Sequence, residues 1–466
     1  MLLRHSRCRN RQASVVLDRL LRRVAASLAP AVCLVGAVLG AASTTDAALS
    51  EQQVLLVYNS QNADSQSVRD HYKSIHPNVH EFDLNDALLN PGTVSYSDYV
   101  DKVRTPIRDH LANEGLSEDI AAMTLTMGIP HRIEDTDDAA VGDTPNAALT
   151  EFDDERDATF ASVDSELTLL WQDLDSGESG GNMDSLSDNW IVNPYRGSTQ
   201  SVNNFDRASI TQSAAFVQLG DQWTMPSADA GDIYLVTRLD GHTVDQVKSS
   251  IDRAQDIEFN RNLDAIVLDE DGDNDFDNSS LFGDDYTKAQ DLLAADWSPG
   301  RLIHEQTSDF VTDDVAGPIA LLASYGSNHV NGNTTYTDDL AGQFVDGAIF
   351  NTYESFNGRV LGGVTGDKGQ EQIADFIANG GTLGFGHVWE PFANSVARNE
   401  WFVQNFLLGD LSWAEAAYTA IPYLSWQQIV IGDPLATVTL VPEPSTAALV
   451  MLPAAALLAR RRGPAA

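Results

Sequence analysis

The stretch Gly231–Ala254, "GDIYLVTRLDGHTVDQVKSSIDRA", holds the pattern that decides the fold. Its first half is an uninterrupted apolar run that ends in Arg238 and Asp240, as expected for a strand buried on both faces. Thr243 then supplies an N-cap for a helix. A buried strand that leads through a short turn into a helix is the repeating unit of a parallel α/β sheet.

The same order of strand and helix recurs along the chain. Apolar runs occur at Val54–Tyr58 and in "DIAAMTLTMGIPHRI", "NLDAIVLDEDGD", "GPIALLASYGSN" and "DGAIFNTYESFNGR", and helical patterns begin near Ser65 and Tyr286. Continuous apolar runs of about five residues that alternate with helices predict a mostly parallel sheet with helices on both faces. We therefore expect an α/β, doubly wound architecture.

Three segments depart from this pattern. Residues 1–48 combine seven arginines with an apolar run that ends in small residues, which is typical of an export signal cleaved between Ala42 and Ala48. A membrane anchor is the alternative, but Ser27 and Pro30 interrupt the run. Residues 135–229 are rich in Asp, Ser, Asn and Gly, and they predict a long loop-rich insertion with one helical stretch, "SVDSELTLLWQDL". The expected organisation is a single domain over residues 49–440 between the signal and a short tail.

The tail, residues 441–466, reads "VPEPSTAALVMLPAAALLARRRGPAA". Its apolar part, Thr446–Ala459, precedes three arginines, which is the order of a stop-transfer element. The tail resembles the PEP-CTERM sorting signal of bacteria that make exopolysaccharide. This resemblance implies cleavage by an exosortase-type membrane protease after transient anchoring through residues 446–459. It also implies a place in the cell envelope or the extracellular matrix, with exopolysaccharide or other matrix components as partners.

Charge and cysteine content exclude several classes of function. The formal net charge of −40, from 68 Asp plus Glu against 28 Lys plus Arg, argues against nucleic acid as a partner. A saline habitat or divalent cations in the medium would explain this excess. The two cysteines, Cys8 and Cys33, both lie in the export signal. The mature protein therefore has no disulfide, no thiolate metal site and no cysteine nucleophile.

The C-terminal half resembles the caspase-like domain of gingipain-type cysteine peptidases. The matching elements are "IALLASYG", "GAIFNTYES", "IADFIANGGTLGFGHVWEP", "WFVQNFLLGDLSWAEAAYTA", expected to be helical, and "IVIGDPLA". In that family a His-Gly pair ends the first strand and the catalytic cysteine ends the second. Here the first position reads Tyr325–Gly326, and no cysteine lies near Thr352–Ser355. The resemblance therefore implies a caspase-like or flavodoxin-like sheet without the peptidase dyad.

The whole mature chain also resembles a bacterial family of exported proteins to which no activity is attached. The shared elements are "VYNSQNADS", "GIPHRI", "SVDSEL", "TRLDG", "HVWEP" and "WQQIVIGDPL". This resemblance supports a coherent fold and leaves the function open.

Polar residues that follow the strands are the candidates for a site, because open parallel sheets bind ligands beyond the carboxyl ends of their strands. The binding candidates are Asn59, Arg132, Arg238, Asp240 and Arg359. For catalysis, Ser355 could act as nucleophile and His387 as base, with Glu390 or Glu354 to orient the base. His387 and Glu390 could instead bind a metal, although Pro391 disfavours a helix there. The competing interpretation is that these residues only cap turns and helices.

The acidic loop "DEDGDNDFDNSSLFGDD" suggests calcium. Carboxylates alternate at Asp269, Asp271, Asp273, Asp275 and Asp277, and carboxylate oxygens are the ligands that calcium requires. An EF-hand register can be drawn, but Asn278 replaces its glycine and Asp284 its glutamate. A solvated loop is the alternative.

Two functions follow from these observations. The first is a non-catalytic envelope or matrix protein that binds calcium or polymer. The second is a hydrolase that uses Ser355, His387 and a carboxylate in the strand-end cleft.

Overall fold

The computed structural model describes residues 48–134, 161–171, 191–205, 233–272, 285–311, 315, 317–328, 335–362, 364, 370–391, 393–424 and 426–441. All of them lie in one compact unit, residues 45–466. The predicted export signal up to residue 47, most of the predicted insertion and the predicted tail from residue 442 lie outside this range. Within the described part of the chain, no helix is long and apolar enough to cross a bilayer.

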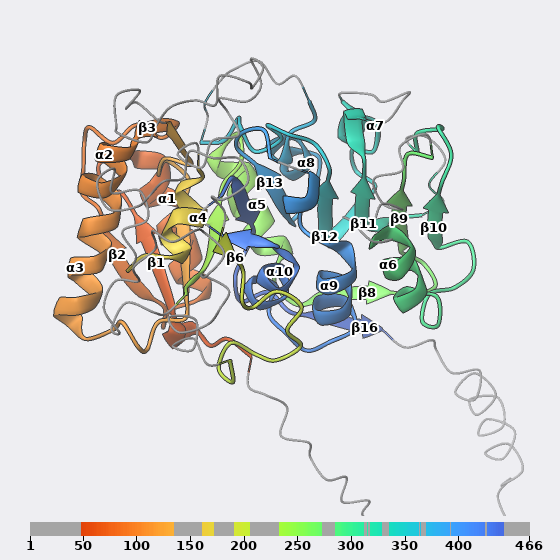
Figure 1. Ribbon diagram of the computed structural model, residues 1–466, viewed down its shortest axis with the longest axis horizontal. Helices are drawn as coiled ribbons and strands as arrows, with labels where there is room; N and C mark the ends of the chain where they lie inside the picture. The colour runs from red at the N-terminus through yellow and green to blue at the C-terminus, as the bar shows by residue number, and fades with distance from the viewer. Residues whose placement is uncertain are drawn as a thin grey trace, which may run out of the picture. The chain divides into compact units, whose positions relative to one another are not determined.

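A ten-stranded sheet organises the fold, and β2 and β10 lie at its two ends (Figure 1). Parallel pairing joins β10, β9, β11, β12 and β13, and also β7, β4, β1 and β2, whereas β13 and β15 pair antiparallel. The order is β10 (Leu302–Glu305), β9 (Ala265–Asp269), β11 (Ile319–Ser324), β12 (Phe344–Thr352), β13 (Leu383–His387), β15 (Gln428–Ile431), β7 (Leu235–Leu239), β4 (Ala122–Thr126), β1 (Val54–Tyr58) and β2 (His80–Asp83). The mostly parallel sheet expected from the apolar runs is confirmed.

Three two-stranded sheets accompany it. They pair β3 (Thr93–Ser95) with β5 (Arg132–Glu134), β6 (Ile191–Val192) with β14 (Tyr423–Leu424), and β8 (Ile257–Asn260) with β16 (Val438–Val441).

The described helices begin where the sequence offers caps. The Asn62 side chain accepts hydrogen bonds at the start of α1, and Thr243 caps α5 as its sequence predicts. The helices are α1 (Ala63–Ile75), α2 (Tyr96–Tyr99), α3 (Thr105–Glu114), α4 (Val163–Thr168), α5 (Val244–Arg253), α6 (Asp285–Leu293), α7 (Tyr336–Asp339), α8 (Ile373–Ala378), α9 (Asn399–Phe402) and α10 (Trp413–Ala420).

Helices cover both faces of the sheet at β13. Successive strand residues point to opposite faces. Gly384 faces Ile373 of α8, while the Phe385 ring packs on Phe402 and Trp413, from α9 and α10, at centroid distances of 5.4 and 5.3 Å. This confirms the expectation of helices on both sides.

The C-terminal helical stretch expected over "WFVQNFLLGDLSWAEAAYTA" is divided. A π-helical turn, Val403–Leu407, follows α9, and α10 begins only after Ser412. Ser412 and Glu415 form a reciprocal capping box, which the spacing Ser-x-x-Glu favours and which starts a new helix. The capping box thus starts a second helix within a stretch that was expected to form one.

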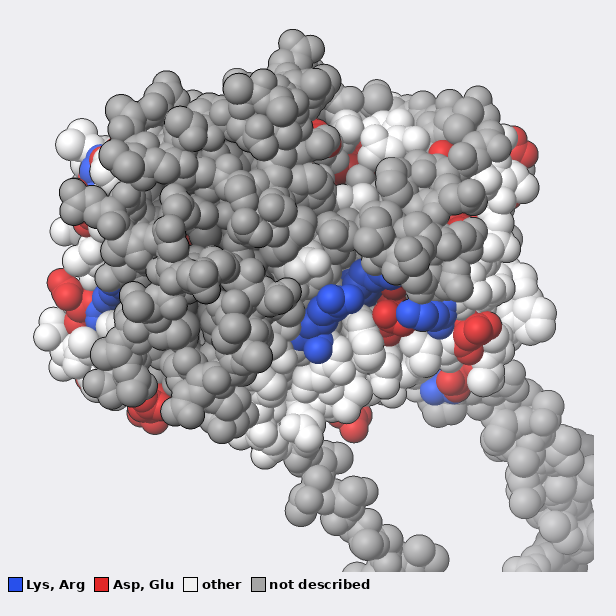
Figure 2. Space-filling model, in the orientation of Figure 1, with Lys and Arg blue, Asp and Glu red and all other residues white. Residues whose placement is uncertain are grey.

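Acidic and basic side chains of the described residues lie side by side on the visible surface. Figure 2 shows a short band of basic side chains with acidic ones next to it. Ion pairs such as Lys288–Glu400, at 3.1 Å, show the same mixing.

Candidate functional site

Segments that follow four different strands meet at one edge of the sheet. Trp389, after β13, donates from Nε1 to the Ile133 carbonyl, after β4, at 3.2 Å. The Gly362 amide, after β12, donates to Oδ1 of Asp240, after β7, at 2.8 Å. The structure therefore brings several of the predicted strand-end residues to the same edge.

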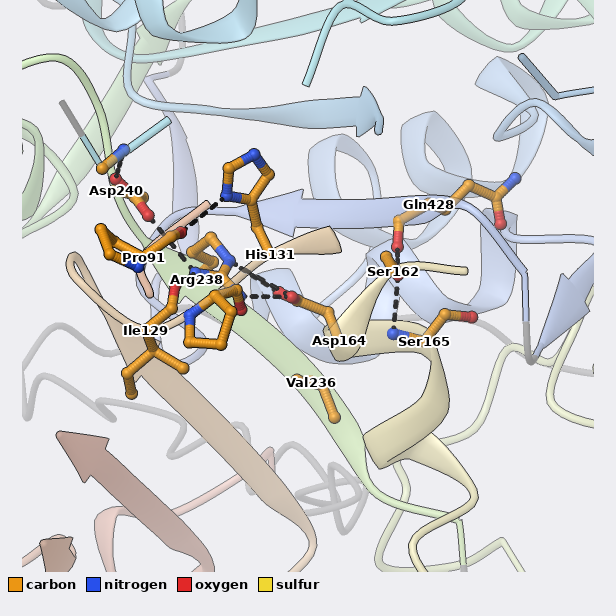
Figure 3. A network of polar contacts seen from close by, with 12 residues as sticks. Pro91, Ile129, His131, Ser162, Asp164, Ser165, Val236, Arg238, Asp240 and Gln428 are labelled. Carbon is orange, nitrogen blue, oxygen red and sulfur yellow. Dashed lines mark hydrogen bonds and ion pairs between the residues drawn. The ribbon is translucent and has the colours of Figure 1, made fainter. Parts of the chain in front are cut away.

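Arg238 lies at the centre of this edge and is fully buried (Figure 3). Its guanidinium donates to Asp164 through Nε, at 3.1 and 3.2 Å, and through Nη2, at 2.6 Å. The remaining N–H groups reach the Ile129 and Pro130 carbonyls, both at 2.8 Å, and Asp240 at 3.3 Å. An arginine has five N–H donors, and these contacts use all of them. Arg238 thus links three chain segments and keeps no donor for a ligand.

Asp240 is engaged in the same way. Its Oδ1 accepts from the Gly241 and Gly362 amides, both at 2.8 Å, and its Oδ2 accepts from Arg238. Burial raises the pKa of Asp240 to about 6, although Arg238 opposes this shift. The carboxylate therefore serves to hold the segment after β12 against β7.

The binding candidate Asn59 is also used within the chain. Its Nδ2 donates to the Asp86 carbonyl at 2.8 Å, and its Oδ1 accepts from the Gln61 and Asp86 amides at 3.1 Å. Asn59 therefore joins the segments that follow β1 and β2.

Arg132 and Arg359 lie over aromatic rings. The Arg132 guanidinium is 5.2 Å from the Trp389 ring, and that of Arg359 is 4.7 Å from the Phe356 ring. Phe356 has φ of 55°, a backbone conformation that is uncommon for an aromatic residue. Within the described chain Arg359 has no carboxylate partner, so its guanidinium is the least engaged of the binding candidates.

His387 ends β13 and is completely buried. Its Nδ1 lies 2.8 Å from the Glu354 carbonyl oxygen. A carbonyl can only accept, so Nδ1 carries the proton and Nε2 carries a lone pair. Burial lowers the pKa of His387 to about 4, which keeps the ring neutral near pH 7. Among the residues that the structure describes, Nε2 has no hydrogen-bond partner.

The other proposed members of a catalytic set have separate partners. Ser355 Oγ donates to Gln370 Oε1 at 3.3 Å, and no hydrogen bond joins the described atoms of Ser355 and His387. Glu390 lies beyond the end of β13 and is partly exposed. Ser355 and His387, predicted as nucleophile and base, thus lie at the ends of the neighbouring strands β12 and β13, but no hydrogen bond between them is found in the described chain.

Glu354 is buried and accepts hydrogen bonds on both oxygens. Oε1 accepts from the Ser327 amide and hydroxyl at 2.9 and 2.7 Å and from the Glu371 amide at 3.2 Å. Oε2 accepts from the Tyr336 hydroxyl at 2.6 Å and from Thr352 Oγ1 at 2.9 Å. Burial raises the pKa of Glu354, and the hydrogen bonds from Tyr336 and Ser327 oppose that shift. The carboxylate therefore fixes the segments after β11 and β12 rather than orienting His387.

Gly326 explains how tightly Glu354 is held. Gly326 has φ of 61°, and a Cβ there would collide with the Glu354 carboxyl group. The chain segments at Tyr325–Gly326 and Thr352–Ser355 are thus adjacent, and the Glu354 side chain packs against Gly326.

His131, next to the binding candidate Arg132, joins two further segments. Its Nδ1 lies 3.1 Å from the Pro91 carbonyl and its Nε2 3.0 Å from the Arg359 carbonyl. Burial, with Arg238 and Arg132 nearby, lowers the pKa of His131 to about 3. The neutral ring has one N–H and donates to one of these two carbonyls.

The calcium candidates are only partly described. Asp269 is buried, accepts from Ser324 Oγ at 3.0 Å, and has its pKa raised to about 7 by burial. Asp271 is buried, and Asp273, Asp275 and Asp277 lie outside the described residues. Within the described ranges, no group of three or more His, Cys, Asp or Glu residues could hold a metal ion. A calcium site in this loop therefore stays a prediction.

The Gly-Asp-Pro element after β15 anchors the chain. Asp433 accepts from the Tyr72 hydroxyl, from His76 Nε2, both at 2.8 Å, and from the Leu435 amide at 2.9 Å. His76 Nδ1 also lies 3.5 Å from Glu51. Although burial lowers it, the hydrogen bond to Asp433 raises the pKa of His76 above its usual value. This group ties α1 to the segment after β15.

Asn351 in β12, Gln428 in β15 and Glu371 are among the buried polar residues that were not predicted as site residues. Asn351 lies inside a run interpreted as an apolar strand, and Gln428 directly precedes the element "IVIGDPLA". A polar side chain within a strand that is buried on both faces is the signal that could have identified them.

Comparisons of the chain with protein-family models, with curated proteins and with solved structures found no match.

Proposed function

We propose that this protein is an exported, non-catalytic component of the cell envelope or the extracellular matrix that binds a ligand at the carboxyl edge of its sheet. One observation carries the proposal: Ser355 and His387, the predicted nucleophile and base, make their hydrogen bonds to other partners. A serine hydrolase needs the imidazole within hydrogen-bond reach of the hydroxyl. The carboxylate of Glu354, predicted as the orienting group, is directed at Ser327 and Tyr336 instead.

The likeness to caspase-like peptidases without their dyad supports the same function. Tyr325–Gly326 and Thr352–Ser355 follow the adjacent parallel strands β11 and β12, as the family positions of histidine and cysteine would. The Tyr353 amide donates to the Ser324 carbonyl at 3.2 Å, so the two strand ends are held side by side. Tyrosine and glutamate at these ends provide no thiol nucleophile.

The proposal includes the localisation of the protein. An export signal in residues 1–48 and a PEP-CTERM tail in residues 441–466 would deliver the chain to the membrane, where an exosortase-type protease removes the tail. The exopolysaccharide and matrix components of such an envelope are the expected partners, and a strongly acidic chain suits a surface rich in cations.

A serine-reactive fluorophosphonate probe tests the absence of catalysis. The purified full chain is incubated with the probe beside the variants Ser355→Ala and His387→Ala and beside a known serine hydrolase. We expect labelling of the known hydrolase only. Labelling of Ser355 that disappears in His387→Ala would overturn the proposal.

A hydrolase remains the second candidate because of one observation. His387 has the tautomer that a general base requires, with Nδ1 donating and the Nε2 lone pair unengaged. Catalysis would require Ser355 Oγ to leave Gln370 and turn to Nε2. The probe experiment decides between the two functions.

A further inference from the structure

Three neighbouring strands present polar side chains on one face near their carboxyl ends. His387 of β13 and Gln428 of β15 are direct cross-strand partners. Phe350 pairs with Gly384, so the next residue of β12, Asn351, is level with Phe385 and shares the face of His387. All three side chains belong to residues that are at most 3% exposed.

These side chains hold four buried polar atoms without hydrogen-bond partners in the described chain. They are Oδ1 of Asn351, Nε2 of His387, and both Oε1 and Nε2 of Gln428. Leaving such an atom unpaired is unfavourable, and native proteins rarely do so. The set therefore points to a group that binds there.

The remaining contacts hold the three residues in place. Asn351 Nδ2 donates to the Ala397 carbonyl and to Asn399 Oδ1, both at 2.9 Å, so its Oδ1 faces away from them. Ser162 Oγ donates to the backbone carbonyl of Gln428 at 2.6 Å, and Figure 3 shows the Gln428 side chain extending away from Ser162. The side-chain amide of Gln428 is thus left for another partner.

His387 and Gln428 are close enough to share one bound group. The Val388 amide donates to the Gln427 carbonyl at 3.0 Å, which makes His387 and Gln428 a non-hydrogen-bonded antiparallel pair. In such a pair the Cα atoms are about 4.5 Å apart and the side chains are close. A single small group can therefore contact both.

The chemistry of the four atoms selects the ligand. His387 Nε2 and Asn351 Oδ1 are acceptors, and the Gln428 amide both donates and accepts. Hydroxyl groups match this set, because each can donate to an acceptor and accept from the amide. None of the three side chains is charged, so a charged ligand would lose its hydration without gaining a counter-charge.

We propose that Asn351, His387 and Gln428 form a buried binding site for a neutral, hydroxyl-bearing ligand such as a sugar unit. This deepens the proposed binding function and rests on it. The three residues are buried, so neighbouring parts of the chain must move for the ligand to enter.

The test is an NMR titration of the full chain carrying ¹⁵N-labelled histidine, with D-glucose as the neutral probe. D-glucuronate and D-glucosamine are the charged controls, since they share the sugar ring. We expect glucose to shift the His387 Nε2 resonance in a saturable way at pH 7, and the charged sugars to leave it unchanged. Gln428→Leu should weaken glucose binding at least tenfold without lowering the melting temperature, because it removes polar atoms that lack a partner in the chain.

Two results would overturn the assignment. One is a His387 resonance that no sugar shifts, which would leave water as the only partner of these atoms. The other is unchanged glucose affinity in Gln428→Leu; if that variant does not fold, the titration of the unsubstituted chain decides alone. If no sugar binds and the fluorophosphonate probe does not label the protein, only the proposed ligand class is rejected. If the probe labels Ser355, the proposed non-catalytic function itself is rejected.

Discussion

Arg238 and Asp164 form a buried ion pair at the centre of the carboxyl edge, with exposed fractions of 0% and 1% for their side chains. Removing a charge from water is costly, and this pair recovers the cost through good geometry and through hydrogen bonds from every guanidinium N–H. The pair joins the start of α4 to β7 and to the segment after β4. Its role is to fix the edge on which the candidate residues lie.

We predict that Asp164→Asn lowers the free energy of unfolding by about 3–5 kcal/mol, because it leaves the buried Arg238 charge incompletely compensated. Urea unfolding followed by circular dichroism measures this loss. Asp252→Asn is the control, since that side chain is 60% exposed beside His71 and should change stability by less than about 1 kcal/mol. Equal losses for the two variants would contradict a structural role for the buried pair.

Glu371 makes stability depend on pH. Both of its oxygens accept from Thr337, and burial raises its pKa to about 8 from an ordinary value of 4.5. The folded state thus retains a proton that the unfolded state releases between pH 4.5 and 8, so this group lowers the stability as the pH rises through that window.

The variant Glu371→Gln cannot ionise. We predict that its stability relative to the parent chain rises from pH 4.5 to 8 and is constant above pH 8. Chemical denaturation at a series of pH values measures the difference. A difference that does not change with pH would show that Glu371 ionises normally in the folded protein.

At the scale of elements, β13 depends on its glycines. The strand lies between α8 on one face and α9 with α10 on the other, and Gly384 allows α8 to approach. A Cβ on Gly384 would lie 2.7 Å from Ile373 Cδ1 and 2.8 Å from the Phe350 carbonyl oxygen. The Phe350 backbone and the buried helix α8 can move little to make room for this Cβ.

We predict that Gly384→Ala destabilises the protein by about 1–3 kcal/mol through this overpacking. Gly241→Ala is the matched control, because its Cβ would meet neighbours at ordinary distances of 3.4 and 3.5 Å. Thermal unfolding compares the two. If Gly384→Ala and Gly241→Ala have the same melting temperature, α8 does not approach β13 as closely as described.

The alternation of strands and helices was predictable from the sequence because it depends on local patterns. The apolar run at Val54–Tyr58 and the cap at Thr243 specify their elements without help from distant residues. The break between α9 and α10 was missed, since an apolar pattern conceals the capping box of Ser412 and Glu415. At this point the apolar pattern favours one helix, whereas the capping box favours the start of a new helix, and the structure has the new helix.

At the scale of the whole molecule, the candidate site was predictable only in outline. The order of strands implies that residues after them meet at one edge, but it does not fix the direction of a side chain. Ser355 and His387 therefore reach nearby positions and bind different partners. Arg238 was predicted as a ligand-binding residue, yet Asp164, 74 residues away in the sequence, engages it. Such pairings depend on tertiary packing, which cannot be inferred from the spacing of apolar residues in the sequence.

The proposed ligand site depends on a neutral His387 whose Nε2 lone pair is unengaged within the described chain. The separate hydrogen-bond partners of Ser355 and His387 are the reason to expect binding without cleavage. The proposed ligand site fails if the ring is turned or charged.

Multiple-bond ¹H–¹⁵N NMR of the full chain with labelled histidine tests this most directly. We expect His387 to be neutral from pH 5.5 to 8, since burial lowers its pKa to about 4, and we expect the proton to stay on Nδ1 as the donor to the Glu354 carbonyl. A ring that titrates near its usual pKa of about 6.5, or one with its proton on Nε2, would contradict the assignment of His387 as a neutral hydrogen-bond acceptor.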